Sequence, residues 1–210
     1  MSQDKPLINA LNNLGLQDED IAKGITDYGY PSDRSMPQSF GTLAKIIIGQ
    51  QISRHVATSL WAKLTGANLT SAKALVTAAP DMLKAHGVSQ RKAEYLIGLA
   101  RAIETGALDL GQLPHLSGQE VQDRLTALRG IGAWTADNYR LFALGDMDAW
   151  PGNDIALQEA MRRLKRLNSR PDMAQMEILA AHWSPYRGAG ALFLWHLYAI
   201  EVRHATPSAI

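Results

Sequence analysis

Apolar residues recur along most of the chain at the three- and four-residue spacing of a helix. Nowhere do Val, Ile and Thr alternate for long enough to indicate a strand. Short breaks rich in Gly, Pro and Ser separate the periodic stretches, and no internal repeat, low-complexity segment or clear linker interrupts them. The pattern predicts an all-α fold with helices over Asp18–Tyr28, Phe40–Leu64, Ser71–Ala78, Asp81–His86, Gln90–Thr105, Ser117–Leu128, Thr135–Leu144, Asp154–Leu167, Met173–His182 and Ala189–Arg203.

Two glycines separate two of these predicted helices. Helical spacing ends after residues 121–128 and resumes at Thr135. Gly130 and Gly132 lie between them, where they allow positive φ angles and a close approach of another molecule to the backbone. The second helix of such a hairpin begins with free N–H groups and a positive dipole end, which form an anion site suited to a phosphate. An ordinary helical hairpin without a ligand explains the same residues.

Asp154 begins the next predicted helix, directly after the segment Trp150-Pro151-Gly152-Asn153. An Asp near a helix start is commonly an N-cap that accepts hydrogen bonds from the first N–H groups, and either Asn153 or Asp154 fits that role. The preceding Trp-Pro-Gly also favours a shaped, partly apolar entry in which a carboxylate is held near a substrate. Both interpretations of Asp154 stay open at this point.

Composition narrows the class of protein. A length of 210 residues with 46% hydrophobic content suits one compact domain or two closely packed lobes. The absence of Cys excludes disulfides and cysteine-ligated metals or clusters, and the six His lack ligand spacing. No window approaches a membrane span, and the first residues lack the basic-then-apolar order of a signal peptide. We therefore expect no metal, no other cofactor and no membrane partner.

The formal net charge of +1 is low for a protein that binds nucleic acid. Acidic residues are concentrated in the first 40 positions, so the remainder carries the positive excess. The densest basic run consists of Arg162, Arg163, Lys165, Arg166 and Arg170. Such a run is usually a solvated helix face, but its position after Asp154 allows phosphate contact.

Three blocks of sequence, taken together, resemble the helix-hairpin-helix DNA glycosylases, and most closely the 3-methyladenine DNA glycosylase II type. They are Phe40–Ser53, which is similar to a first core helix and its turn, Leu128–Asp154, which is similar to the hairpin, loop and aspartate signature, and Trp183–Tyr198, which is similar to the C-terminal segment. The blocks stand in the family's order. The resemblance implies a single glycosylase domain of two helical lobes with a central cleft, the middle of the chain (about 41–145) forming one lobe.

The resemblance also implies which residues contact DNA and the damaged base. The expected DNA-binding residues are Gly130, Gly132, Thr135, Gln51 and Ser53. Gln51 is expected to fill the gap left by a flipped nucleotide, although relatives often have an apolar side chain there. The expected base pocket consists of Trp134, Trp183, Tyr30 and Trp150, with Trp61 and Trp195 assigned to the core. A cationic purine gains stacking and cation–π attraction between such rings.

By the same resemblance, Asp154 is the expected catalytic residue of a reaction that cleaves the N-glycosidic bond of an alkylated purine such as 3-methyladenine or 7-methylguanine. The sugar becomes positively charged as the base departs, and a nearby carboxylate stabilises that state. Members that also cut the strand have a lysine at the position of Trp134, and this chain has no lysine between Lys92 and Lys165. The resemblance therefore implies a monofunctional glycosylase.

The expected partner is double-stranded DNA containing damaged bases, bound by a monomer in a bacterial nucleoid or a eukaryotic nucleus. Two other classes of protein remain possible on the sequence. A non-catalytic helix-hairpin-helix module that only binds DNA explains Gly130 and Gly132 but leaves Asp154 and the aromatic residues unexplained. An all-α scaffold without a nucleic-acid role explains the periodicity and the near-neutral charge, but treats the three blocks as coincidence.

Overall fold

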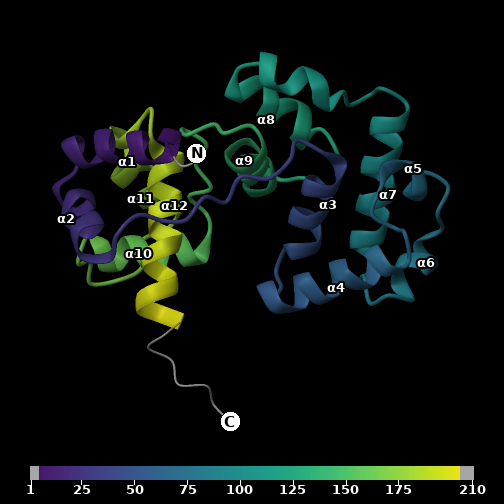
Figure 1. Cartoon of the computed structure of the whole chain (residues 1–210), viewed down its shortest axis with the longest axis horizontal. Helices are drawn as coiled ribbons and strands as arrows, with labels where there is room; N and C mark the ends of the chain where they lie inside the picture. The colour runs from purple at the N-terminus through teal and green to yellow at the C-terminus, as the bar shows by residue number, and fades with distance from the viewer. Residues whose placement is uncertain (1–4, 204–210) are drawn as a thin grey trace, which may run out of the picture. The chain divides into compact units, whose positions relative to one another are not determined.

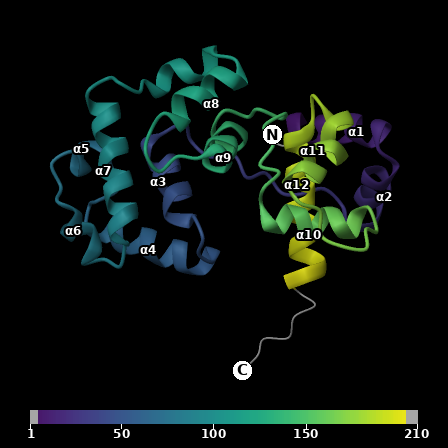
Figure 2. The ribbon, with the colours of Figure 1, turned by 180° about the vertical axis from the view of Figure 1, so that it is seen from behind.

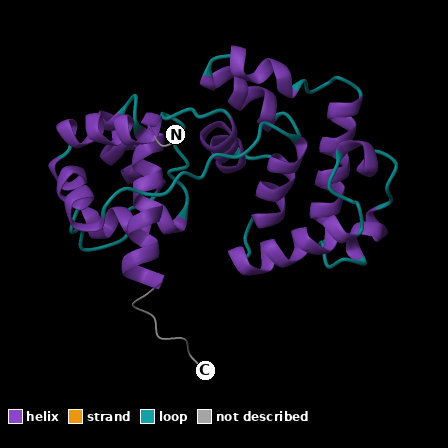
Figure 3. Ribbon diagram, in the orientation of Figure 1, coloured by secondary structure: helices purple, strands orange, loops and turns teal. Residues whose placement is uncertain are grey.

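The computed structural model describes residues 5–203 of the chain, and these residues contain helices and loops but no strand (Figure 3). The predicted all-α fold class is therefore confirmed. The chain divides into two compact units. One, here called the terminal unit, combines the residues up to Arg34 with those from Asp146 onward, and the other, the middle unit, spans Ser35–Gly145.

The terminal unit is built around its last long helix. Helix α12 packs against α1 and α10, and α1 packs against α2, so segments from both ends of the chain share one core (Figure 1). Leu11, Leu14 and Phe193 are completely buried in it. The helices of this unit are α1 (Lys5–Gln17), α2 (Glu19–Tyr28), α10 (Ile155–Leu164), α11 (Met173–Ala180), η2 (Ala181–Trp183), α12 (Arg187–Tyr198) and the π-helical turn η3 (Ala199–Arg203).

The middle unit has two central helices, α3 and α7, which pack against each other (Figure 2). Helix α3 also contacts α4 and α9, and α7 also contacts α5 and α6. Ile47 on α3 and Leu96 on α7 are completely buried in the hydrophobic core of this unit. The helices of this unit are α3 (Phe40–Gly49), α4 (Arg54–Gly66), α5 (Ala72–Leu75), α6 (Pro80–Lys84), α7 (Gln90–Glu104), η1 (Leu110–His115), α8 (Gly118–Thr126) and α9 (Ala133–Ala143).

Most predicted helices are present, with ends that differ by a few residues. The predicted stretch Phe40–Leu64 is two helices, because the polar turn of residues 50–53 ends α3 and Ser53 caps α4. The predicted helices begin at Asp18 and do not include α1, which contains the weak helix formers Asn12, Asn13 and Gly15. Its apolar positions nevertheless lie at helical spacing, and burial of that face outweighs the weak propensity of the polar residues.

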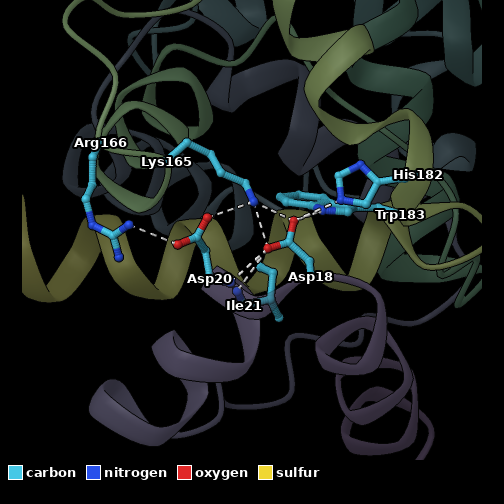
Figure 4. Close-up of polar contacts among 7 residues, drawn as sticks. All are labelled: Asp18, Asp20, Ile21, Lys165, Arg166, His182 and Trp183. Carbon is cyan, nitrogen blue, oxygen red and sulfur yellow. Dashed lines mark hydrogen bonds and ion pairs between the residues drawn. The ribbon is translucent and has the colours of Figure 1, made fainter.

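Asp18 connects the sequence-distant parts of the terminal unit (Figure 4). Its carboxylate caps α2, accepting hydrogen bonds from the N–H groups of Asp20 and Ile21. It also accepts hydrogen bonds from Trp183 Nε1 at 2.7 Å and from Lys165 Nζ at 2.6 and 2.7 Å. His182 Nε2 lies 3.0 Å from the same carboxylate. Because Asp18 is only 4% exposed, these partners replace the water that the charge has lost.

The charged form of Asp18 is strongly favoured. Burial by itself would raise the pKa of Asp18, but the hydrogen bonds from Lys165 and Trp183 outweigh it and lower the pKa from 3.8 to about 2. A carboxyl whose pKa is lower in the folded state stabilises that state above its unfolded pKa. The shift corresponds to about 2 kcal/mol, which is present above pH 3.8 and lost as the pH falls toward 2.

Asp18→Asn is expected to lower the free energy of unfolding at neutral pH by about 2 kcal/mol, because Lys165 then lacks its buried counter-charge while the N-cap persists. Urea titration followed by tryptophan fluorescence measures the loss, which should shrink as the pH approaches 2. Asp20→Asn is the control. Its carboxylate also pairs with Lys165 but is 26% exposed, so a loss of less than about 1 kcal/mol is expected. Equal losses in both variants would contradict the assignment of Asp18.

Candidate functional site

The hairpin between α8 and α9 has the predicted glycine turn, and its two glycines differ in their constraints. Gly130 has a φ of +96°, and a Cβ at this position would lie 2.2 Å from Cγ of Tyr95, so only glycine fits. Gly132 has an extended backbone, with φ −95° and ψ 177°, and a Cβ there would meet no atom within 4 Å. The turn is therefore pressed onto α7 at Gly130 and open at Gly132.

Gly132 is the N-cap of α9, which begins at Ala133, two residues earlier than predicted. No side chain caps this end of the helix, and the first helical hydrogen bond runs from Ala136 N–H to Gly132 O at 3.0 Å. Gly132 and Ala133 are both exposed. The end of the helix dipole thus meets solvent at a position without a blocking side chain, as an anion site requires.

Thr135 is placed differently from the prediction. The residue is 2% exposed, and its hydroxyl accepts a hydrogen bond from Gln50 Nε2 at 2.9 Å. The side chain is therefore part of the interior support of the hairpin. Any contact of Thr135 with an outside anion uses its backbone N–H group, in the first turn of α9.

The turn of residues 50–53 presents Gln51 to solvent. Gln51 is exposed and adopts a φ of +57°, a left-handed conformation that is uncommon for a residue with a side chain. Ser53 is also exposed, and its hydroxyl caps α4 by accepting a hydrogen bond from Val56 N–H at 3.3 Å. The turn thus ends one helix, projects one polar side chain and starts the next helix.

Gln50 and Lys92 support this turn, and the sequence did not single out either residue. The Gln50 amide donates to Gly130 O at 3.0 Å as well as to the Thr135 hydroxyl. Lys92 Nζ donates to Ile48 O and Gln50 O, both at 2.7 Å. Burial lowers the pKa of Lys92. Gln50 and Lys92 donate only to backbone carbonyls and to one hydroxyl group. The sequence therefore offers no oppositely charged partner that would identify either residue.

In the terminal unit, Asp154 is the N-cap of α10, as one of the two interpretations predicted. Its Oδ1 accepts hydrogen bonds from Ala156 N–H at 2.8 Å and Leu157 N–H at 3.1 Å. The indole N–H of Trp195 donates to the same oxygen at 3.4 Å. Asp154 is half-buried, so these donors orient a carboxylate that remains accessible from outside. The cap and the chemical role are therefore compatible.

Trp195 is a third residue that the sequence analysis did not identify, since it was assigned to the core. It lies half-buried on α12, and the guanidinium of Arg34 stands 5.3 Å from the centre of its ring. The cation–π contact and the hydrogen bond to Asp154 join three residues that are far apart in sequence. Only the helical spacing of the aromatic residues on α12 was visible beforehand, and that spacing is typical of core residues.

The loop that leads to Asp154 is fastened at Asp148. Arg187, at the start of α12, donates to both Asp148 oxygens, through Nε at 2.9 Å and Nη2 at 2.6 Å. Burial raises the pKa of Asp148, but the hydrogen bonds from Arg187 outweigh this effect and the pKa is lowered. The bidentate pair fixes this loop to the start of α12.

The four aromatic residues expected to line a base pocket differ in burial, and they belong to two units: Trp134 to the middle unit, and Tyr30, Trp150 and Trp183 to the terminal unit. Trp183 is completely buried and edge-on to Trp150, with ring centres 5.8 Å apart, and Trp150 is 7% exposed. Tyr30 is 42% exposed and donates to Asn12 Oδ1 at 2.5 Å. Trp134 is half-buried against the core of the middle unit. The burial of Trp183, whose indole N–H serves Asp18, favours a packing role over contact with a base.

The basic run after Asp154 is largely paired with acids of the same unit. Arg162 and Arg163 both bond Glu159, and Lys165 and Arg166 both pair with Asp20. The hydrogen bond from Arg162 is the main reason that the pKa of Glu159 falls to about 2, and burial opposes it only in part. Four of the five cations therefore have internal partners, which reduces the attraction of this run for phosphates.

Within residues 5–203, no cluster of three or more His, Asp or Glu side chains is arranged to hold a metal ion. No helix in the same range is both long enough and apolar enough to cross a membrane.

The sequence and the fold are similar to those of known repair proteins. A family model described as "HhH-GPD superfamily base excision DNA repair protein" matches residues 44–185. The DNA-3-methyladenine glycosylase of Bacillus subtilis (strain 168) is 25% identical over 175 residues, which cover 77% of this chain and 58% of that protein. YfjP of the same organism, provisionally named a DNA-3-methyladenine glycosylase, is 39% identical over 107 residues, covering 51% of this chain and 37% of YfjP. The chain thus spans less than two thirds of the length of either relative.

Among solved structures, the 3-methyladenine DNA glycosylase of Schizosaccharomyces pombe, in complex with abasic DNA, has a TM-score of 0.82 and 26% identity. The similarity covers 89% of this chain and 95% of that chain. The family match spans both the glycine hairpin and Asp154, and the structural match extends over both units. The chain therefore belongs to the HhH-GPD superfamily of base excision DNA repair proteins.

Proposed function

We propose that the protein is a monofunctional DNA glycosylase that excises alkylated purines, such as 3-methyladenine and 7-methylguanine, from duplex DNA. The observation that carries this proposal is the carboxylate of Asp154. It is oriented by two backbone N–H groups and by Trp195, within the stretch that matches the repair family. In a module that only binds DNA, the same carboxylate would act as the N-cap of α10 alone.

Binding to DNA is assigned to the middle unit. The uncapped start of α9, with Gly132 and Ala133 exposed, receives a backbone phosphate through N–H groups. Gln51, exposed at its turn, enters the duplex and occupies the space that the flipped nucleotide leaves. Because the contacts use backbone groups and one wedge, they are independent of sequence, as repair of scattered damage requires.

The base is received by aromatic side chains that have accessible surface. Tyr30 is the most exposed of the four expected pocket residues, and Trp134 is half-buried. An alkylated purine carries a positive charge and gains from contact with the faces of such rings. Tyr30 in the terminal unit and Trp134 in the middle unit are therefore the candidates for contact with the base, and the buried pair Trp150 and Trp183 has a supporting role.

Cleavage breaks the bond between C1′ of the sugar and the purine nitrogen. The bonding electron pair leaves with the cationic base, which becomes neutral, and positive charge develops on the sugar. Asp154 stabilises that charge electrostatically, because its orientation is fixed before the reaction begins. Water then adds to C1′ and releases a proton, leaving a hydroxyl group on an abasic sugar and an uncut strand.

The direct test is release of free base from methylated duplex DNA, with DNA affinity measured on the same preparation. Base release with strand retention supports the proposal. Tight binding without release would identify a DNA-binding module, and the absence of both would point to a scaffold protein.

Asp154→Asn is expected to slow single-turnover base release by about 100- to 1,000-fold, the scale of losing one preorganised electrostatic contact. Folding should be retained, because Asn is as good an N-cap as Asp. Asp172→Asn is the matched control, since Asp172 caps α11 in the same way. A rate near that of the wild type in Asp154→Asn, or an equal loss in the control, would remove Asp154 from the chemistry.

Gly132→Asp is expected to separate stability from binding. Asp is a favourable N-cap and Gly132 has room for a side chain, so the melting temperature should be unchanged or slightly raised. A carboxylate at that position repels phosphate, and affinity for any duplex should fall about tenfold or more. Gly132→Asn controls for size alone. Gly130→Ala, by contrast, should cost at least about 1–3 kcal/mol in stability, because of the positive φ and because the new Cβ would overlap Tyr95. Undiminished affinity in Gly132→Asp would argue against phosphate capture by this turn.

Borohydride treatment during the reaction is expected to trap no covalent enzyme–DNA adduct. The position that holds a lysine in strand-cutting members of the family is Trp134. The two lysines nearest in sequence are both engaged, Lys92 with backbone carbonyls and Lys165 with Asp18 and Asp20. Recovery of an adduct at a mapped lysine would replace the monofunctional assignment with a Schiff-base mechanism.

A further inference from the structure

Helix α7 contacts both segments that are proposed to bind DNA, the turn of residues 50–53 and the Gly130–Gly132 turn. The two contacts come from residues three positions apart on α7. Lys92 holds the carbonyls of Ile48 and Gln50, immediately before the exposed Gln51. Three residues later, the ring of Tyr95 lies against Gly130 in the hairpin turn. Residues three apart on a helix lie on the same face. Lys92 and Tyr95 therefore fix the positions of both turns relative to one face of α7.

Gln50 joins the two turns directly. Its amide donates both to Gly130 O and to the Thr135 hydroxyl, which places one bond on each side of the uncapped helix start at Gly132. The backbone carbonyl of Gln50 accepts from Lys92. The residue therefore links the end of α3, the hairpin and α7, while its neighbour Gln51 points to solvent.

These contacts are more specific than the packing of a core requires. Three of the four acceptors are backbone carbonyls, those of Gln50 and Gly130 in the turns and that of Ile48 in the last turn of α3, so the bonds determine where the two turns lie. Buried polar networks are costly when incomplete, and apolar side chains would pack this space without that risk. Moreover, Gln51 holds a left-handed φ, which persists only where the surroundings fix the backbone.

We propose that Gln50 and Lys92 are positioning residues that hold Gln51 and the Gly130–Gly132 turn in a fixed register. Grip on the DNA backbone and insertion into the duplex then occur together. The inference rests on the proposed function, in which these two turns contact DNA. It adds that the position of the hairpin determines where Gln51 enters the duplex, because Gln50 and Lys92 hold the two turns at a fixed distance from each other.

The test uses the full chain with Lys92→Met, which keeps the length of the side chain but removes its donor, and with Gln50→Met. Lys92→Arg is the conservative variant, and Lys63→Met, at an exposed lysine on α4, is the matched control. Base release is measured for 7-methylguanine opposite cytosine and opposite adenine. Flipping is measured separately by the brightening of a 2-aminopurine placed next to the damaged base.

Lys92→Met and Gln50→Met are expected to slow release from the paired substrate by about tenfold and from the mispaired one by less than about twofold, because a mispaired base needs less help to leave the helix. Gln51→Ala should slow release from the paired substrate in the wild-type protein but should add little in the Lys92→Met variant. In that variant Gln51 is already out of position, so its removal changes the rate little. Lys92→Arg should recover part of the rate, and Lys63→Met should match the wild type.

Equal losses on paired and mispaired substrates, or an additive effect of Gln51→Ala, would overturn the inference and leave Gln50 and Lys92 as parts of the fold only. If Lys92→Met does not fold, Gln50→Met and its combination with Gln51→Ala decide by the same ratios. If the wild type releases no base, the proposed reaction fails. The 2-aminopurine signal then decides the inference by itself: a signal lost in Gln50→Met supports it, and one equal in both proteins overturns it.

Discussion

The terminal unit depends on one buried negative charge. It is assembled from two stretches of chain that are more than a hundred residues apart, and Asp18 is where they are joined. Its carboxylate binds the start of α2, the lysine that follows α10, and the tryptophan of η2. Helix α10 carries Asp154 at its other end, so the residue that joins the unit also fixes the far end of the helix that holds the candidate catalytic group. Helix α10 therefore has the candidate catalytic residue at its start and, at its end, the lysine that pairs with Asp18.

The periodicity of apolar residues was enough to predict the fold class and most helices, because burial of one face determines where a helix forms. Glycine spacing likewise pointed to the hairpin, and the position of Asp154 before an apolar helix predicted its cap. The supports were not predictable in the same way. Lys92 and Gln50 donate to backbone carbonyls, which every residue has, and Trp195 reaches Asp154 across 41 positions. Such contacts depend on how helices pack, and spacing along the chain contains no information about them. For Trp183 the sequence pointed to contact with a base, because the residue stands at a motif position, but its side chain is completely buried.

Charge in this protein is used mainly within the chain. The basic run after Asp154 faces Glu159 and Asp20, and Arg187 faces Asp148, so a count of cations overstates what is offered to DNA. In the proposed function, neutral groups supply much of the binding: the N–H groups at the start of α9 and the amide of Gln51. A near-neutral chain is consistent with this design, because partial charges fixed on rigid backbone act at short range without attracting counter-ions over the whole surface.

The contact of Gly130 with the ring of Tyr95 has a consequence for how this site changes in evolution. The proposed anion site is made of backbone N–H groups, which a point mutation cannot delete, although an acidic side chain at Gly132 would oppose an anion there. Selection acts instead on the two residues that shape the turn. A smaller side chain at position 95 would remove the ring contact, but the Cβ of residue 95 would still lie 2.7 Å from a Cβ at position 130, and the φ of +96° at position 130 would still favour glycine. The ring is therefore the freer partner, and substitutions at position 95 should precede any at position 130.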